Sequence, residues 1–174
     1  MNRPLQTLVL LALLLPSVPA LSATVRAPEV CAPPGGEATV AVSVDEARGL
    51  AGFKIALTYD ANILEFKLAA RTEATRSMMH VVNDREPGRL IVVMAAARGI
   101  TGKDLPLVSL TFRVRENPPD PAAKSGKRKK PGKSGASGNP PPVCASLAFT
   151  GGQLMGEDLK EIPLAFGPGA KNAP

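Results

Sequence analysis

The chain is poor in aromatic residues. Its 174 residues include no tryptophan, one tyrosine and five phenylalanines, so that aromatic residues make up 3% of the sequence. Surfaces that bind polysaccharides usually present exposed aromatic rings with large flat faces. Tyr59 and the phenylalanines fall at positions that the sequence pattern predicts to be buried. Binding of a crystalline polysaccharide is therefore not expected, whereas a soluble glycan held by polar loops stays open.

The residues typical of metal sites and active sites are also scarce. His80 is the only histidine, and Cys31 and Cys144 are the only cysteines, so a zinc site is not expected. A glycosidase needs two carboxylates across a cleft, but most acidic residues of this chain fall in predicted turns. These are Asp60, Asp84, Glu86, Asp104, Glu157 and Asp158. The serines lack the Gly-x-Ser-x-Gly context of a nucleophile elbow. We expect no enzyme activity, no cofactor and no metal.

A single long apolar run stands at the N-terminus. Residues 1–23 have the pattern of a secretory signal: Arg3 precedes the apolar residues 8–15, and Pro16 ends them. Small residues allow cleavage after Ala20 or after Ala23. The alternative is a buried N-terminal helix. The run is shorter than the ~20 apolar residues that span a bilayer. We expect a secreted protein, extracellular or periplasmic, with no membrane span.

Export would permit a disulfide between Cys31 and Cys144. A bond that closes a loop of roughly 100 residues stabilises the fold by about 4.7 kcal/mol in the chain-entropy model. Two free buried thiols are the alternative interpretation.

Positive charge is concentrated in one segment. The net charge of the chain is +6, and most of this excess lies in residues 116–142, a stretch rich in Pro, Gly, Ser and Lys. The segment has no apolar period, so we expect a disordered loop inserted between two strands. The run Lys127, Arg128, Lys129 and Lys130 could attract anionic polymers such as acidic glycans or lipid headgroups. No aromatic residue is interleaved to stack a base, so nucleic acid is not expected. The alternative is a loop that only aids solubility.

The most informative stretch is residues 49–66. Phe53, Ile55, Leu57 and Tyr59 alternate with Gly52, Lys54, Ala56 and Thr58. This period of two predicts a strand with one buried face. Asp60 suits an Asx-type turn, after which a second strand begins at Leu64.

Short strands separated by turn residues continue along the chain. We expect them at 24–30, 37–44, 64–70, 81–82, 89–97, 107–115, 143–149, 154–155 and 162–166. Connections are expected at 45–48 and 99–106, a strand break at Gly151-Gly152, and either a short helix or a loop at 71–79. Residues 89–97 are apolar on both parities, which predicts a central strand covered on both faces, or partly so. The pattern indicates an all-β sandwich over residues 24–166, followed by a tail at 167–174.

Several motifs resemble the cohesin family. They are Gly49-Leu50-Ala51-Gly52-Phe53, Leu57-Thr58-Tyr59-Asp60 and Leu64-Glu65-Phe66, followed by 87–92, 107–114 and 156–163. Together they span residues 24–166 apart from the basic insert. The resemblance implies a nine-stranded jelly-roll β-sandwich related to certain carbohydrate-binding modules. It also implies a non-catalytic module that binds a dockerin or another protein, in complexes that degrade polysaccharides.

The chain departs from this family at the central strand. Ala61 stands where the family usually has proline. Cohesins that hold dockerins tend to carry Asn and Asp at the positions of Gly52 and Lys54. A glycine side chain cannot form a hydrogen bond with a partner helix, and a lysine reverses the charge. The predicted partner-binding face is Gly52, Lys54, Ala56, Thr58, Ala95 and Ala97. An ordinary solvated sheet face and a glycan-binding module are the alternatives.

Overall fold

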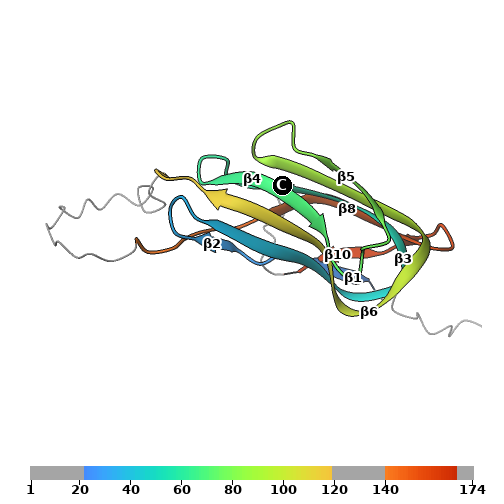
Figure 1. Cartoon of the computed structure of the whole chain (residues 1–174). Coiled ribbons are helices and arrows are strands. Elements are labelled where there is room, and N and C mark those ends of the chain that lie inside the picture. Colours follow the sequence, from blue (N-terminus) through green and yellow to red (C-terminus); the bar gives the residue numbers. More distant parts are fainter. Residues whose placement is uncertain (1–21, 119–139, 168–174) are drawn as a thin grey trace, which may run out of the picture.

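The structure is a computed structural model, and it describes residues 22–118 and 140–167 (Figure 1). The predicted signal at 1–23 therefore lies almost wholly outside the described residues. The basic run Lys127, Arg128, Lys129 and Lys130 and most of the tail at 167–174 lie outside them as well. Within the described residues, no helix has the length and apolar character needed to cross a membrane.

The described residues form strands joined by turns, so the predicted all-β class is confirmed. The strands are β1 (Ala23–Arg26), β2 (Val30–Ala32), β3 (Glu37–Thr58), β4 (Leu64–Arg71), β5 (Met79–Asn83), β6 (Arg89–Val114), β7 (Val143–Ala145), β8 (Ala148–Gly156), β9 (Glu161–Ile162) and β10 (Leu164–Phe166).

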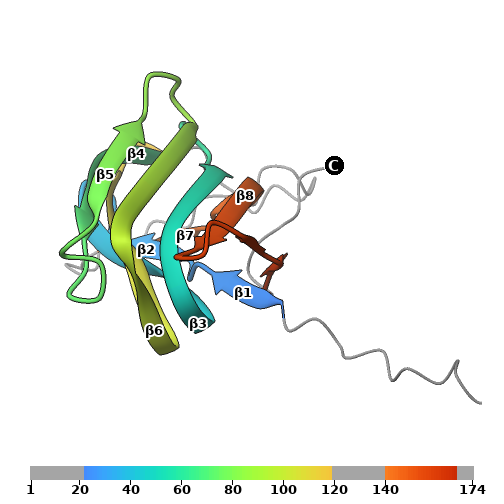
Figure 2. The ribbon, with the colours of Figure 1, turned by 90° about the vertical axis from the view of Figure 1, so that its right-hand side faces the viewer.

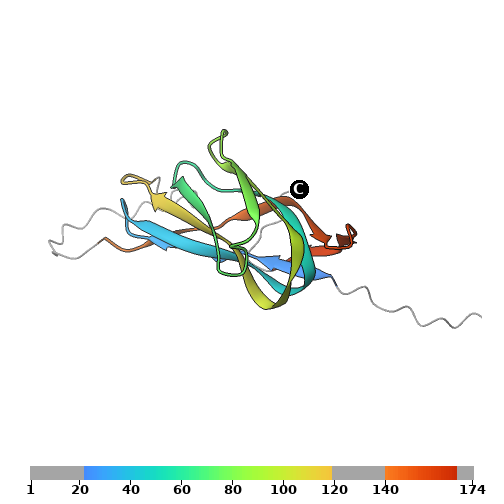
Figure 3. The same cartoon turned by 45° about the vertical axis from the view of Figure 1, so that its right-hand side comes forward.

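Two long strands, β3 and β6, run through both layers of the sandwich. The first half of β3 pairs with the second half of β6, in a layer that has the order β10-β1-β3-β6-β4. The second half of β3 pairs with the first half of β6, and here β8 and β5 complete the layer as β8-β3-β6-β5. Figures 2 and 3 show β3 and β6 as long curved strands. The sandwich is thus one folded-over sheet rather than two separate sheets.

The bend in β3 and β6 occurs at bulges, where the register of their pairing shifts. Gly49 has φ +65°, a conformation that suits glycine. A Cβ on Gly99 would lie 2.3 Å from the carbonyl carbon of Gly49, so this close approach of the two strands requires glycine.

The predicted connections at 45–48 and 99–106 are wrong, since both stretches are strand. The break expected at Gly151-Gly152 is also wrong, because β8 continues past these residues. These predictions failed because glycines that occupy bulges or close backbone contacts within a strand cannot be distinguished in the sequence from glycines that form turns.

The core fills the space between the two layers, and the alternation seen in the sequence correctly predicts its inward residues. Val40, Val42 and Val44 are buried in the first layer, and Phe53, Ile55 and Leu57 are buried in the second. Phe112 lies edge-on to the half-buried Tyr59, with ring centroids 5.1 Å apart. The core therefore orients the opposite parity of β3 towards solvent.

Of residues 71–79, which were expected to form a short helix or a loop, 72–78 form turns between the end of β4 at Arg71 and the start of β5 at Met79. Thr75 is fully buried there, and its hydroxyl donates a hydrogen bond of 2.9 Å to the carbonyl oxygen of Leu107. The hydroxyl of Thr72 donates to the carbonyl oxygen of Pro106. Pro106 and Leu107 lie at a register shift in β6, where a buried carbonyl needs a donor from outside the sheet. The loop supplies these donors.

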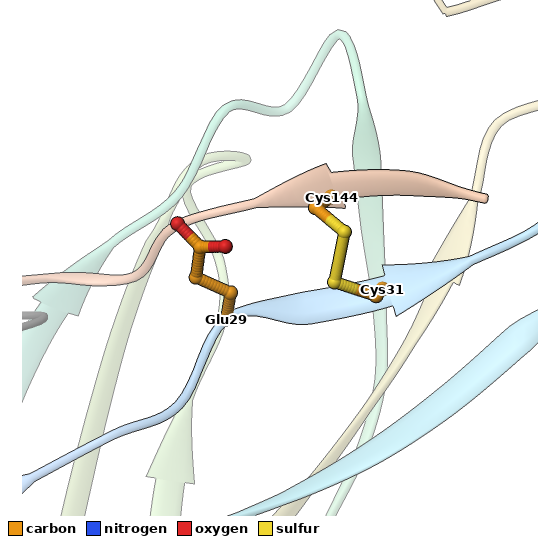
Figure 4. A group of neighbouring side chains, drawn as sticks. All are labelled: Glu29, Cys31 and Cys144. Atoms are coloured by element: carbon orange, nitrogen blue, oxygen red, sulfur yellow. A yellow bond between two sulfur atoms is a disulfide. The ribbon is translucent and has the colours of Figure 1, made fainter.

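Strands β2 and β7 form a separate two-stranded sheet that holds the disulfide. Cys31 lies opposite Cys144, and the two are bonded with a Cα–Cα distance of 4.1 Å. The side chain of Glu29 lies beside this bond (Figure 4) and accepts a hydrogen bond of 3.1 Å from the hydroxyl of Ser146. With both sulfur atoms joined to each other, they are not thiolate ligands for a metal.

Candidate partner-binding face

The outward side of β8, β3, β6 and β5 forms a surface that we call the outer face. In Figure 2 these strands follow one another in the order β5, β6, β3 and β8. Their register places the outward residues in rows across the sheet. The rows are Met155–Gly52–Ala95–Met79, then Gln153–Lys54–Val93–Val81, then Gly151–Ala56–Ile91–Asn83, and finally Ala148–Thr58–Arg89.

The structure brings most of the predicted face residues together on this surface. Lys54 and Ala95 are exposed, and Ala56 and Thr58 are half-buried. Ala97 is also exposed, but it lies where the regular pairing between β3 and β6 is interrupted.

Gly52 differs from the expectation, because it is buried. Its backbone lies between β6 and β8, and a Cβ there would approach the carbonyl oxygen of Met94 to 3.3 Å. Gly52 therefore shapes the sheet rather than offering a side chain to a partner.

A shallow hollow of about 570 Å³ lies in the outer face over β8, β3 and β6. Its lining includes Lys54, Ala56, Thr58, Arg89, Ile91, Thr150, Gly151, Gly152, Gln153 and Glu161. Small residues create the hollow: Ala56 pairs with Gly151, and no atom lies within 4 Å of the position that a Cβ on Gly151 would take. Large side chains from a partner could therefore enter here.

An apolar strip next to the hollow was not predicted as part of the face. The side chains of Met79, Val81 and Val93 are 78%, 66% and 38% exposed. The signal was present in residues 89–97, which are apolar on both parities. One parity, with Val92 and Met94, is buried in the core, whereas Val93 and Ala95 of the other parity remain exposed. The prediction of a partly covered strand is the one that the structure supports.

Charged residues of both signs line the hollow, namely Lys54, Arg89 and Glu161. Within the described part of the chain, Lys54 makes no ion pair, whereas Arg89 pairs with Glu86 at 3.3 Å. In the turn after β8, hydrogen bonds from Lys160 lower the pKa of the Asp158 carboxyl. The face thus offers apolar contact, a hollow and an unpaired lysine, which suits recognition of another macromolecule.

Comparisons with known proteins agree with this geometry. The model of the cohesin domain family matches residues 23–132. A search of curated proteins finds no match for the sequence.

Solved structures of cohesins share the fold. A non-cellulosomal cohesin from the hyperthermophilic archaeon Archaeoglobus fulgidus is similar, with a TM-score of 0.62, 20% identity, and coverage of 84% of this chain and 86% of that one. The sixth cohesin of scaffoldin B from Acetivibrio cellulolyticus, solved in complex with the Cel5 dockerin, has a TM-score of 0.61 and 16% identity, and covers 84% and 95%.

A type I cohesin from Clostridium thermocellum, solved as the Coh-OlpC–Doc435 cohesin–dockerin complex, has a TM-score of 0.61 and 17% identity, with coverage of 84% and 89%. At these identities the likeness establishes the fold, including its jelly-roll sandwich. Since the family model matches more than half of the sequence, the chain belongs to the cohesin family.

Proposed function

We propose that this chain is a non-catalytic protein-binding module that holds a dockerin-like or other protein partner on its outer face. The exposed strip of Met79, Val81 and Val93 beside an open hollow is the observation that carries the proposal. Contiguous apolar surface of this kind marks interaction sites on soluble proteins. Family membership supports it, and two of the similar cohesins are solved with dockerins bound.

The chemistry of the face indicates the kind of partner. Lys54 stands at the middle of the face and forms no ion pair among the described residues, although Glu161 lines the same hollow. Its ammonium group is therefore free to meet a carboxylate on the partner. Next to it, Val93 and Val81 continue the same row across the sheet and favour apolar side chains. The partner element is an amphipathic surface with an acidic group, such as a helix lying on the sheet.

Export and a role in polysaccharide-degrading complexes belong to the same proposal. The exposed disulfide between Cys31 and Cys144 suits an oxidising compartment outside the cytosol. The signal-like residues 1–23 point to the same compartment.

Capture from secreted proteins of the source organism, with and without calcium, tests the proposal. Calcium is included because dockerins fold around calcium loops of the EF-hand type. The captured protein is identified by mass spectrometry, and its affinity is measured by calorimetry. Lys54→Glu and Ala56→Arg should abolish capture, since the first reverses the charge and the second fills the hollow.

Ala41→Arg is the matched control. Ala41 is half-buried like Ala56 and lies on the same strand, but it faces outward from the other layer. If the Ala56→Arg and Ala41→Arg variants capture equal amounts of the partner, the outer face is not the binding site. Capture that a soluble glycan competes away would favour the glycan-binding alternative.

A further inference from the structure

Strand β5 is an open sheet edge. It pairs with β6 on one side, and in the described part of the chain no strand pairs with its other side. Figure 2 shows β5 as the outermost strand of its layer. An open edge offers unpaired backbone N–H and C=O groups to another chain.

The other edge strand next to β6, β4, carries features that discourage such pairing. Its register shifts between Phe66 and Leu68, which marks a bulge. Lys67 lies at this bulge and forms an ion pair of 2.8 Å with Glu65. Bulges and lysines are the common means by which proteins protect their sheet edges.

Strand β5 has none of these features. It reads Met-His-Val-Val-Asn, without lysine, proline or glycine, and it pairs with β6 without a register shift. Its outward side chains Met79 and Val81 are 78% and 66% exposed. A flat, uncharged and apolar edge is unusual on a monomer and favours pairing with another strand.

We propose that β5 pairs with β5 of a second copy of this chain, antiparallel about a two-fold axis at Val81. A strand of five residues pairs with itself along its full length when the axis passes through its middle residue. Val81 then lies opposite the Val81 of the second copy, and Met79 lies opposite Asn83. Outward residues remain on the same side of the joined sheet, because directly opposed residues of an antiparallel pair share a face.

The charges that flank β5 favour a second copy as the occupant. Arg76 precedes Val81 by as many positions as Glu86 follows it, and the two residues lie in the turns on either side of β5. A two-fold axis at Val81 therefore places the turn with Arg76 of each copy beside the turn with Glu86 of the other. Both side chains are exposed, at 75% and 72%, and each also pairs within its own copy, Arg76 with Glu73 and Glu86 with Arg89. Arg85 comes to the position opposite the uncharged Ser77. Each flanking turn thus carries charges of both signs, which allows the opposed turns of two copies to form a self-complementary interface.

The dimer does not depend on the proposed function, but it would change how a partner is recognised. The two outer faces would join into one continuous sheet surface, with the exposed Met79 and Val81 of both copies at its centre. Two partner sites would lie side by side and face the same way. A partner with two binding elements would then be held more tightly than by one copy.

Sedimentation velocity of the full chain over a wide concentration range tests the dimer. The mass should rise from that of one 18.1 kDa chain to twice that value as concentration increases. Val81→Lys should keep the mass at that of one chain at every concentration, because it places two lysines directly opposite each other across the two-fold axis. Leu68→Lys is the matched control, since Leu68 is an apolar residue that is 57% exposed on the protected edge. It should dimerise like the parent chain.

A crosslinking variant gives a second measurement that does not depend on destabilising the interface. Directly opposed residues of an antiparallel pair have Cα atoms about 4.5–5.5 Å apart, within the Cα–Cα range of a disulfide. Val81→Cys should form a covalent dimer on oxidation, and Leu68→Cys should not.

The proposal is overturned if the parent chain stays a monomer at the highest concentration reached, or if Val81→Lys dimerises as the parent does. It also fails if Ala56→Arg abolishes the dimer, since that result would place the contact on the hollow rather than on the edge. None of these outcomes bears on capture of a partner by a single copy, so the two proposals can fail separately.

Discussion

The two outward surfaces of the sandwich are built from the same two strands but differ in chemistry. On the first layer, the outward side of β3 and β6 carries mainly hydroxyl groups, and the hydroxyls of Thr39 and Thr111 bond to each other at 2.8 Å. On the second layer, the outer face carries an unpaired Lys54, exposed Val93 and a hollow. The first surface pairs two of its hydroxyls across the central strands, whereas the second leaves Lys54 without an ion pair among the described residues and Val93 exposed. This difference suggests that stability and recognition lie on opposite sides of the molecule.

Removal of the disulfide should have the largest effect on stability and none on recognition. The bond joins residues separated by 113 positions, and β2 leads through a short turn into the first half of β3. Replacing Cys31 and Cys144 by serine should lower the free energy of unfolding by about 2–5 kcal/mol, measured by urea titration. If affinity for the captured partner falls at 4 °C or at room temperature, where the variant is still folded, the separation of the two sides is wrong.

Gly151→Arg should have the opposite effect. The arginine would project into the hollow, and because no atom lies within 4 Å of its Cβ position, the fold should keep its stability. Partner affinity should fall about 100-fold, or roughly 2.8 kcal/mol, by calorimetry. Ser109→Arg, which changes a half-buried outward residue of the first layer, is the control. Equal losses for both variants would show that added charge, not the hollow, is responsible.

Thr75→Val should weaken the bulge that lets β6 bend. The variant keeps the shape of the side chain but leaves the buried carbonyl oxygen of Leu107 without its donor. We expect a loss of about 1–3 kcal/mol in the free energy of unfolding. Thr39→Val removes an exposed hydrogen bond of the first layer and should change stability by less than about 0.5 kcal/mol. Similar losses of unfolding free energy in the two variants would mean that the burial of a hydrogen bond does not determine how much it stabilises the fold.

The smallest expected effect is a pH dependence in the first layer. Burial alone would raise the pKa of the Asp45 carboxyl, but hydrogen bonds from Thr24 and Glu46 and the charge of Arg26 lower it below the usual 3.8. The ionised form is therefore favoured in the folded state, so its stabilisation is present above pH 3.8 and is lost as pH falls through the lowered pKa. Asp45→Asn should unfold at a lower temperature than the parent at pH 6. This difference should shrink at pH 2 in thermal unfolding experiments, and a constant difference would contradict the assignment.

The sequence was sufficient to predict the strand class, the inward parity and most of the outer face. Alternation of Phe53, Ile55 and Leu57 with Lys54 and Ala56 is a local property of a strand, and burial follows from it. The continuity of β3 and β6 was not predictable in this way. Gly49, Gly99 and Pro106 are typical of loops, but whether such residues end a strand or bend it depends on which distant strand lies alongside.

The apolar edge was missed for a similar reason. Val81 and Val82 alone indicate a short strand, but the sequence does not say that it lies at an edge. Met79 and Val81 are exposed because no further described strand lies beside β5. The order of strands in the sheet decides this, and the local sequence does not. The burial of Gly52 likewise depends on the strands on either side of it.

The passage of β3 and β6 through both layers has a consequence for how the molecule opens. Each of these strands contributes backbone hydrogen bonds to both layers, so we expect the two layers to unfold together. Hydrogen–deuterium exchange should therefore show the slowest amides of both halves exchanging together, with the rate set by global unfolding. A ligand held on one side would then slow exchange on the far side as well.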